Sequence, residues 1–497
     1  MSKSKGVLLP FVFFLVSTSL LSPNSVVYGS SVQEQSFNRP DPLRHFKSYS
    51  GGYDVRSKHY WASAAFTGVH GYAIAGVWTL CGLGFGIFMI VKNLSSSSTS
   101  IADHSNSRYF ILFLLILLFT FLAIVATSFA LAANQSTLRR TKKLKETILR
   151  AGGDARRTIR KVTKAFKEMQ HHLLPYDPDT SFRLNITTHR LGKESRIIQR
   201  FVQKNGHSIN LAIQTSYIAH LGVVTVNLVL LVAALVLLLL HWHPAFITII
   251  FICWILTTLC WVLTGFDFFL HTFAEDTCSA FEDFQQNPLN SSLSSLLPCM
   301  DSSYSNKVIV EIGSTIHNFI TELNLKVTEL HRLLELDEEA EELLGDWRIC
   351  DPFSGAPNYS YIPEKCPKGA IPIGEIPNVL ARFTCYKENS TRECKGNGKF
   401  LTEASFVMAW AYTCSIQDLI NIFPDLQNLA QCSFVKDAFF DVASHQCRPF
   451  RVSVRLLWSS MLCLSIFMVI IVLIWVAKAY QDKGRYFSKC SIIPNPL

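Results

Sequence analysis

The sequence predicts an all-α integral membrane protein with five transmembrane helices, long extracellular helices and a disulfide-rich cap. Three observations predict this architecture: five long apolar runs almost free of charge, nine of the fourteen cysteines within one polar segment, and glycosylation sequons in the polar segments. Runs of about 18 or more apolar residues are typical of helices that cross a bilayer. The overall composition, 49% hydrophobic with a net charge of +9, decides little, because soluble domains have a similar apolar share.

The first 29 residues have the pattern of a secretory signal peptide. Lys3 and Lys5 precede an apolar core at 8–21, and small residues near Gly29 provide a cleavage site. An uncleaved anchor is the alternative, although the core is short for a transmembrane helix. Residues 30–63 are polar and aromatic, and we interpret them as an N-terminal extracellular arm.

The five apolar runs divide the rest of the chain. The runs cover residues 64–91, 109–133, 218–240, 245–270 and 456–476. The resulting segments are transmembrane helices 1 and 2 at 64–133, a basic helical extracellular loop at 134–216, transmembrane helices 3 and 4 at 217–270, a Cys-rich helical extracellular loop at 271–455, transmembrane helix 5 at 456–476 and a cytosolic tail at 477–497. Gly82 and Gly86 share one face of the first helix, where we expect another helix to pack closely.

The long loop before the fifth run indicates an oxidising compartment. Its disulfide candidates are Cys278, Cys299, Cys350, Cys366, Cys385, Cys394, Cys414, Cys432 and Cys447. The cysteine spacings match no zinc motif, and this density is typical of disulfide-bonded extracellular proteins. Because the count is odd, one cysteine is free or pairs between chains.

Glycosylation sequons support the same orientation. The predicted acceptors are Asn185, Asn290, Asn358 and Asn389. A further sequon at Asn134 abuts the second apolar run, too close to the bilayer to be modified. A cleaved signal and five transmembrane helices place both large loops outside and the tail in the cytosol.

The charge of the first large loop opposes this orientation. Residues 134–216 hold 18 Lys and Arg against 6 Asp and Glu, a net charge of +12, which the positive-inside rule would place in the cytosol. That rule applies chiefly to loops shorter than about 60 residues. We therefore keep the loop outside.

Two segments of opposite charge suggest a helix pair outside the membrane. Residues 137–170 read as a basic helix, and residues 306–347 as an acidic helix with a near-heptad apolar stripe. We expect the two helices to pair through their apolar seams, with charge selecting the partner. The alternative is two unrelated solvated helices. Helical character also continues the third and fourth runs, over 194–220 and 267–286.

This layout resembles known families of five-span membrane proteins. The signal, five spans, two short turns and two large helical loops are similar to prominin, whose loops are longer. The same plan with shorter loops resembles the tweety proteins, whose pore motif does not map onto this chain, and a related layout occurs in the fungal plasma-membrane fusion protein. The resemblance is closest to a plant group of this type. It rests on topology, the Gly-rich first run and the cysteine-bearing loop, and it implies membrane organisation, contact with lipid or sterol, and homodimers.

The residues within the apolar runs argue against an enzyme. They carry no hydrolase or metalloprotease motif, so we expect neither an enzyme nor a cofactor or metal site. The placement of charge argues against nucleic acid. Asp267 is the best ionisable candidate, and we interpret it as an interfacial carboxylate that snorkels out of the bilayer.

The predicted function is organisation of membrane or lipid, at the plasma membrane or in the secretory pathway. Its predicted partners are the lipid bilayer, sterol and a second copy of the chain. The alternative is an ion (anion) channel or transporter component. The hydroxyls that would line its path are Thr248, Thr257, Thr258 and Thr264.

Overall fold

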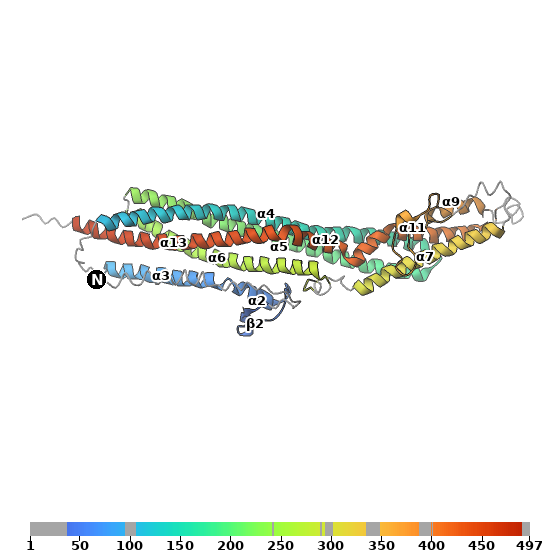
Figure 1. Ribbon diagram of the computed structural model, residues 1–497, viewed down its shortest axis with the longest axis horizontal. Coiled ribbons are helices and arrows are strands. Elements are labelled where there is room, and N and C mark those ends of the chain that lie inside the picture. The colour runs from blue at the N-terminus through green and yellow to red at the C-terminus, as the bar shows by residue number, and fades with distance from the viewer. Residues whose placement is uncertain are drawn as a thin grey trace, which may run out of the picture. The chain divides into compact units, whose positions relative to one another are not determined.

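The computed structural model of the chain is mostly helical (Figure 1). It describes residues 37–94, 106–240, 243–288, 291–293, 302–333, 348–386, 399 and 401–489. The chain divides into two compact units. Unit 1 comprises Met1–Lys145, Ser208–Ser294 and Phe440–Leu497, and unit 2 comprises Glu146–His207 and Ser295–Phe439. The predicted signal peptide, the end of the acidic segment at 334–347 and the last residues of the tail lie outside the described residues.

Among the described residues, five helices are long and apolar enough to cross a membrane, as the sequence predicts. They are α3 (Val69–Leu94), α4 (Asn106–Leu173), α5 (Pro178–Leu239), α6 (His243–Gln286) and α13 (Cys447–Lys489). The expected helical continuations of the third and fourth runs are confirmed, because α5 and α6 contain both segments without a break. The second run likewise continues into the basic segment as one helix of 68 residues.

The core of unit 1 lies among these five helices. Its largest fully buried side chains include Trp78, Trp261 and Trp475, from α3, α6 and α13. Helix α4 contributes alanines such as Ala123 and Ala130 to the same cluster, and small residues let transmembrane helices approach closely. Helix α6 runs between α3 and α13 (Figure 1), so it is the central element of the unit.

The N-terminal arm folds against unit 1 as a small hairpin and a helix. Strand β1 (Arg39–Asp41) pairs antiparallel with β2 (Lys47–Tyr49), and a short 3-10 helix, η1 (Pro42–Arg44), connects them. Helix α2 (Lys58–Phe66) follows and ends just before Gly68, so the helix expected from residue 64 is divided into α2 and α3.

Unit 2 combines helices with a small irregular region. Its helices are α7 (Ser302–Leu333), α9 (Ile376–Leu380), α11 (Glu403–Gln431) and most of α12 (Ser433–Asp441), together with the outer parts of α4 and α5. The described part of the irregular region includes the 3-10 helices η3 (Pro363–Lys365), η4 (Ile373–Glu375) and η5 (Ala381–Phe383). Strands β3 (Thr384–Cys385) and β4 (Leu401–Thr402) pair in parallel. In unit 1, a π-helical turn, η6 (Val442–Gln446), follows α12 and leads into α13.

The structure corrects the expected pairing of the basic and acidic helices. The apolar stripe of α7, including Ile309 and Ile316, packs against Phe423 of α11. The seam of α4 around Phe166 packs against Ile422, also on α11. Each helix therefore buries its seam against α11, which offers an apolar residue to both. Charge follows the same arrangement, because Lys161 of α4 lies 3.6 Å from Asp425 of α11.

Candidate functional site

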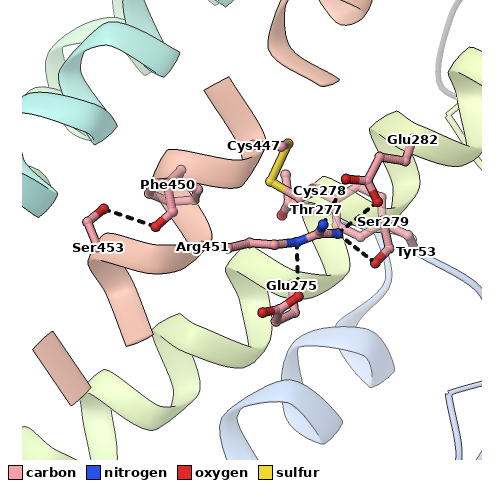
Figure 2. The surroundings of a disulfide bond; sticks show 10 residues. All are labelled: Tyr53, Glu275, Thr277, Cys278, Ser279, Glu282, Cys447, Phe450, Arg451 and Ser453. Atoms are coloured by element: carbon pink, nitrogen blue, oxygen red, sulfur yellow. Dashed lines mark hydrogen bonds and ion pairs between the residues drawn. A yellow bond between two sulfur atoms is a disulfide. The ribbon is translucent and has the colours of Figure 1, made fainter. Parts of the chain in front are cut away.

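One stretch of α6, Glu275–Glu282, binds two other parts of unit 1. We call it the α6 junction. It lies beyond the predicted fourth span, which ends near residue 270. Consecutive side chains point to different neighbours. Asp276 and Thr277 contact the N-terminal arm. Cys278 bonds to Cys447 of α13 (Figure 2). Residues in sequence point about 100° apart around a helix, so one turn can hold several partners.

A buried disulfide joins the junction to the start of α13. Cys278 and Cys447 are 0% and 1% exposed, with their Cα atoms 5.4 Å apart. The bond closes a loop across 169 residues of sequence. In the chain-entropy account such a cross-link stabilises the fold by about 5 kcal/mol, chiefly by restricting the unfolded chain.

Arg451 of α13 reinforces this disulfide. Its guanidinium donates from Nη1 to Oε1 of Glu282 at 2.7 Å and from Nη2 to Oε2 at 3.1 Å. The Nη2 atom also donates to Ser279, and Nε lies 2.9 Å from Glu275 as an ion-pair contact without an aligned hydrogen bond. A bidentate arginine–carboxylate pair fixes orientation as well as distance. The rotation of α13 relative to α6 is therefore set at this point (Figure 2).

The N-terminal arm attaches to the opposite side of the same turn. Arg39 forms an ion pair with Asp276, and the Tyr60 hydroxyl donates to the same carboxylate at 3.1 Å. The Tyr53 hydroxyl lies 3.2 Å from the Thr277 hydroxyl. Burial, together with the nearby Asp276 carboxylate, raises the pKa of Tyr60, so its phenol stays protonated and remains a donor. The arm is thus held by buried polar contacts.

A buried ionisable pair lies at the same end of the bundle, between α5 and α6. Nε2 of His220 lies 2.9 Å and 3.0 Å from the two carboxylate oxygens of Asp267, and Nδ1 lies 2.7 Å from the Ser216 carbonyl. His220 and Asp267 are 1% and 0% exposed. This burial overturns the interpretation of Asp267 as a snorkelling carboxylate. Ionisable pairs inside a membrane bundle are functional candidates by default.

Glycines just before α3 and within it mark where it approaches α6. A Cβ added at Gly68 or Gly71 would meet the backbone of Gly265. A Cβ at Gly82 would meet the indole of Trp254, whereas nothing lies within 4 Å of that position at Gly86. Of the two glycines in the sequence hypothesis, the structure therefore brings Gly82 alone against another helix.

The threonines proposed for a channel path mostly bond to their own helix. Thr257 donates to the Cys253 carbonyl, and Thr258 to that of Trp254. Thr264 donates to the Cys260 carbonyl and also lies 3.0 Å from the Ser465 hydroxyl of α13. Such back-bonding satisfies a hydroxyl without a water-filled path.

The predicted glycosylation residues fall into two groups. Asn185, on α5, and Asn358, in the irregular region, are exposed, whereas Asn290 and Asn389 lie outside the described residues. Asn134 is 5% exposed, and its Nδ2 donates to the Tyr217 carbonyl. In the folded protein Asn134 is therefore inaccessible to an oligosaccharide. This burial is a second reason, besides its position next to the second run, to expect no glycan there.

The predicted cysteines are mostly bonded. Cys350 pairs with Cys366 in unit 2, and Cys385 and Cys432 are also disulfide-bonded. Cys414 has a free thiol, as the odd count allows. Cys299 and Cys394 lie outside the described residues. Across the part of the chain that the structure describes, no group of three or more His, Cys, Asp or Glu residues is arranged to hold a metal ion.

Comparison of the sequence with protein-family models finds no match, and comparison with the curated proteins finds no similar protein. The site must therefore be argued from its own geometry. Sequence reasoning did not find Arg39, Asp276 or Arg451. One signal was present: Asp276, Thr277 and Cys278 lie shortly after the fourth run, and Arg451 lies shortly before the fifth.

Proposed function

We propose that this chain is a multi-pass membrane protein that organises lipid or neighbouring proteins in a bilayer and does not catalyse a reaction. The observation that carries the proposal is the α6 junction. It joins the ends of two membrane-length helices to each other through Cys278–Cys447 and Arg451, and to the N-terminal arm through Asp276. A brace of this kind makes the surface beside the bilayer rigid, and a rigid surface can impose its shape on lipid.

The proposed location is the plasma membrane or another membrane of the secretory pathway, with the braced end on the non-cytosolic side. Disulfides persist in oxidising compartments and are rare in the cytosol, and unit 1 and unit 2 each contain a disulfide. The proposed partners are bilayer lipid, with sterol included, and a second copy of the chain. Exposed apolar side chains such as Leu80 and Phe88 on α3 provide lipid-facing surface.

A vesicle assay tests this function. The full chain is reconstituted into giant vesicles, and tubulation or local lipid diffusion is measured for the wild type, the double variant C278S/C447S and the control C414S. We expect remodelling by the wild type and C414S, and little by the double variant at equal helicity. Remodelling that is absent from the wild type, or unchanged in a well-folded double variant, would contradict the proposal.

A channel is the second candidate, favoured by one observation. Asn227 of α5 is 0% exposed, and within the described part of the chain neither its amide nitrogen nor its amide oxygen has a hydrogen-bond partner. An unpaired amide inside a bundle destabilises the fold by about 1–3 kcal/mol. A role in conducting ions would explain why the chain carries such a group. Chloride flux through liposomes that contain wild-type protein, reduced in N227L, supports the channel. Tight liposomes with both proteins exclude it.

A further inference from the structure

Four basic side chains emerge together from the end of the second apolar run. They are Arg139, Arg140, Lys142 and Lys143 of α4, and all four are exposed. We call them the α4 basic patch. A hydrogen bond just before the patch shows which part of α13 lies beside it. The Thr137 hydroxyl donates to the Ser453 carbonyl of α13. The patch therefore begins where α13 leaves the α6 junction and enters its apolar run.

The nearest acidic residue along the helix, Glu146, lies one turn beyond Lys142 but does not pair with the patch. Within the residues that the structure describes, none of its four side chains forms an ion pair. Basic residues farther along the chain do: Arg157 pairs with Asp154, and Lys164 with Glu168. The next lysine, Lys145, donates to an asparagine oxygen at 3.1 Å. The four charges of the patch are thus available to an external anion.

The patch continues a lipid-facing stripe of the same helix. Residues seven apart on a helix share a face, and residues three or four apart lie next to each other on it. Counting back from Arg139 in such steps leads to Val125, Phe121 and Leu114, which are 36%, 64% and 57% exposed. A lipid whose chains pack along this apolar stripe would have its headgroup at the basic end.

Distances along the helix agree with that placement. At a rise of about 1.5 Å per residue, Arg139 lies about 9 Å beyond Ala133 and Lys143 about 15 Å beyond it. The polar layer adds about 5–8 Å to each side of the hydrocarbon core. Long basic side chains extend several ångströms and can turn back toward the membrane. The charged ends therefore reach the level of lipid phosphates.

We propose that the α4 basic patch binds the phosphate groups of anionic phospholipids in the leaflet from which α4 emerges, with the acyl chains along Leu114, Phe121 and Val125. The inference rests on the proposed function only in placing α4 across a bilayer. Lipid binding also provides a role for these basic residues, which the positive-inside rule would place in the cytosol. Each basic residue near an anionic surface strengthens binding severalfold, so four of them give a selective site.

Lipid retention on matched charge variants tests the proposal. The full chain is reconstituted into nanodiscs of phosphatidylcholine with a minority of phosphatidylglycerol, and bound lipid is counted by native mass spectrometry. The patch variant is R139Q/R140Q/K142Q/K143Q. The control R157Q/R160Q/K164Q/K167Q removes the same charge from exposed positions farther along α4. We expect the patch variant to lose phosphatidylglycerol enrichment by at least about tenfold, and the control to keep it.

The outcomes separate the sources of binding and the two proposals. Equal loss in both variants, or in neither, overturns the inference. Displacement of the lipid by inorganic phosphate would show a site for free anions and would overturn the inference. A patch variant that keeps its lipid enrichment but no longer binds a sulfated polysaccharide would overturn it as well. If enrichment fails while wild-type vesicles are still remodelled, only the lipid site is rejected. If enrichment holds without remodelling, the lipid site stands and only the organising function is rejected.

Discussion

Trp78 of α3 and Trp254 of α6 each donate an indole N–H to the other's backbone carbonyl. The two bonds are 3.2 Å and 3.0 Å long, and the rings stack with centroids 4.3 Å apart. Gly82, one turn along α3, leaves the space that the Trp254 indole occupies. Because both donors are satisfied inside an apolar bundle, this reciprocal contact fixes the register of α3 on α6.

The first prediction compares two glycines of α3. Replacing either glycine by alanine favours the helix by about 1 kcal/mol. At Gly82 the new methyl group must displace Trp254, so we expect G82A to lower stability by about 1–3 kcal/mol. G86A enters open space and should be neutral or stabilising. Thermal unfolding of the two purified variants in the same detergent checks this, and equal melting temperatures would disprove the packing.

The second prediction concerns the buried His220–Asp267 pair. Removing one partner leaves the other buried without compensation, so H220A and D267A should each destabilise the fold by about 3–5 kcal/mol. The double variant H220F/D267L restores apolar volume and should be more stable than either single variant. A thermodynamic cycle from urea or thermal unfolding provides the measurement. Additive losses would show that the two groups act separately.

The third prediction tests Arg451 against a neighbour on the same helix. R451M breaks the bidentate contact with Glu282 and the contact with Glu275, and we expect a loss of about 1–3 kcal/mol. Arg448 is exposed, and R448M should change stability by less than about 0.5 kcal/mol. Proteolysis of the α6 junction should also be faster in R451M alone. Similar behaviour of both variants would remove Arg451 from the brace.

The fourth prediction is a pH dependence at the start of α5. Asp177 accepts hydrogen bonds from the Thr180 backbone amide and hydroxyl at 3.0 Å and 2.7 Å, and these bonds lower the pKa of its carboxyl below 3.8. Because the folded state favours the ionised form, this stabilisation is complete above that value and is lost as the pH falls through the lowered pKa.

Hydrogen exchange measures this effect locally. Amides in the first turn of α5, corrected for intrinsic rates, should lose protection below about pH 3.8 in the wild type. D177N keeps an oxygen acceptor without the charge, so its protection should be lower at neutral pH and independent of pH in this range. A wild-type profile as flat as that of D177N would argue against the cap.

The fifth prediction concerns glycosylation. Chains made in a secretory system should carry glycans at the exposed Asn185 and Asn358, and none at the buried Asn134. N185Q and N358Q should each remove one glycan mass, as seen by mobility before and after peptide-N-glycosidase treatment. N134Q should leave the glycan mass unchanged. A chain with bare asparagines throughout would place these segments on the cytosolic side.

Patterns that repeat along the chain predicted much of the fold. The apolar run near Leu231 predicts a helix, and the seam near Ile316 predicts a buried face, because each depends on neighbours only a few residues away. The same local reasoning predicted the continuation of the fourth run to Gln286, and the structure confirms it. Local reasoning could not say which surface would meet the seam of α7. It assigned the basic segment of α4 as the partner, whereas in the structure the seam packs against Phe423 of α11.

By itself, then, the sequence predicted the five membrane-length apolar helices of the described residues and where they extend, and it showed that the nine cysteines of the long loop leave one over. Tertiary structure decided that Asp267 meets His220, that Cys278 meets Cys447, and that Gly82 accommodates an indole. The physical reason is distance along the chain. Contacts such as Arg39–Asp276 join residues separated by 237 positions, and only the packing of whole helices determines which distant side chains are brought within bonding range.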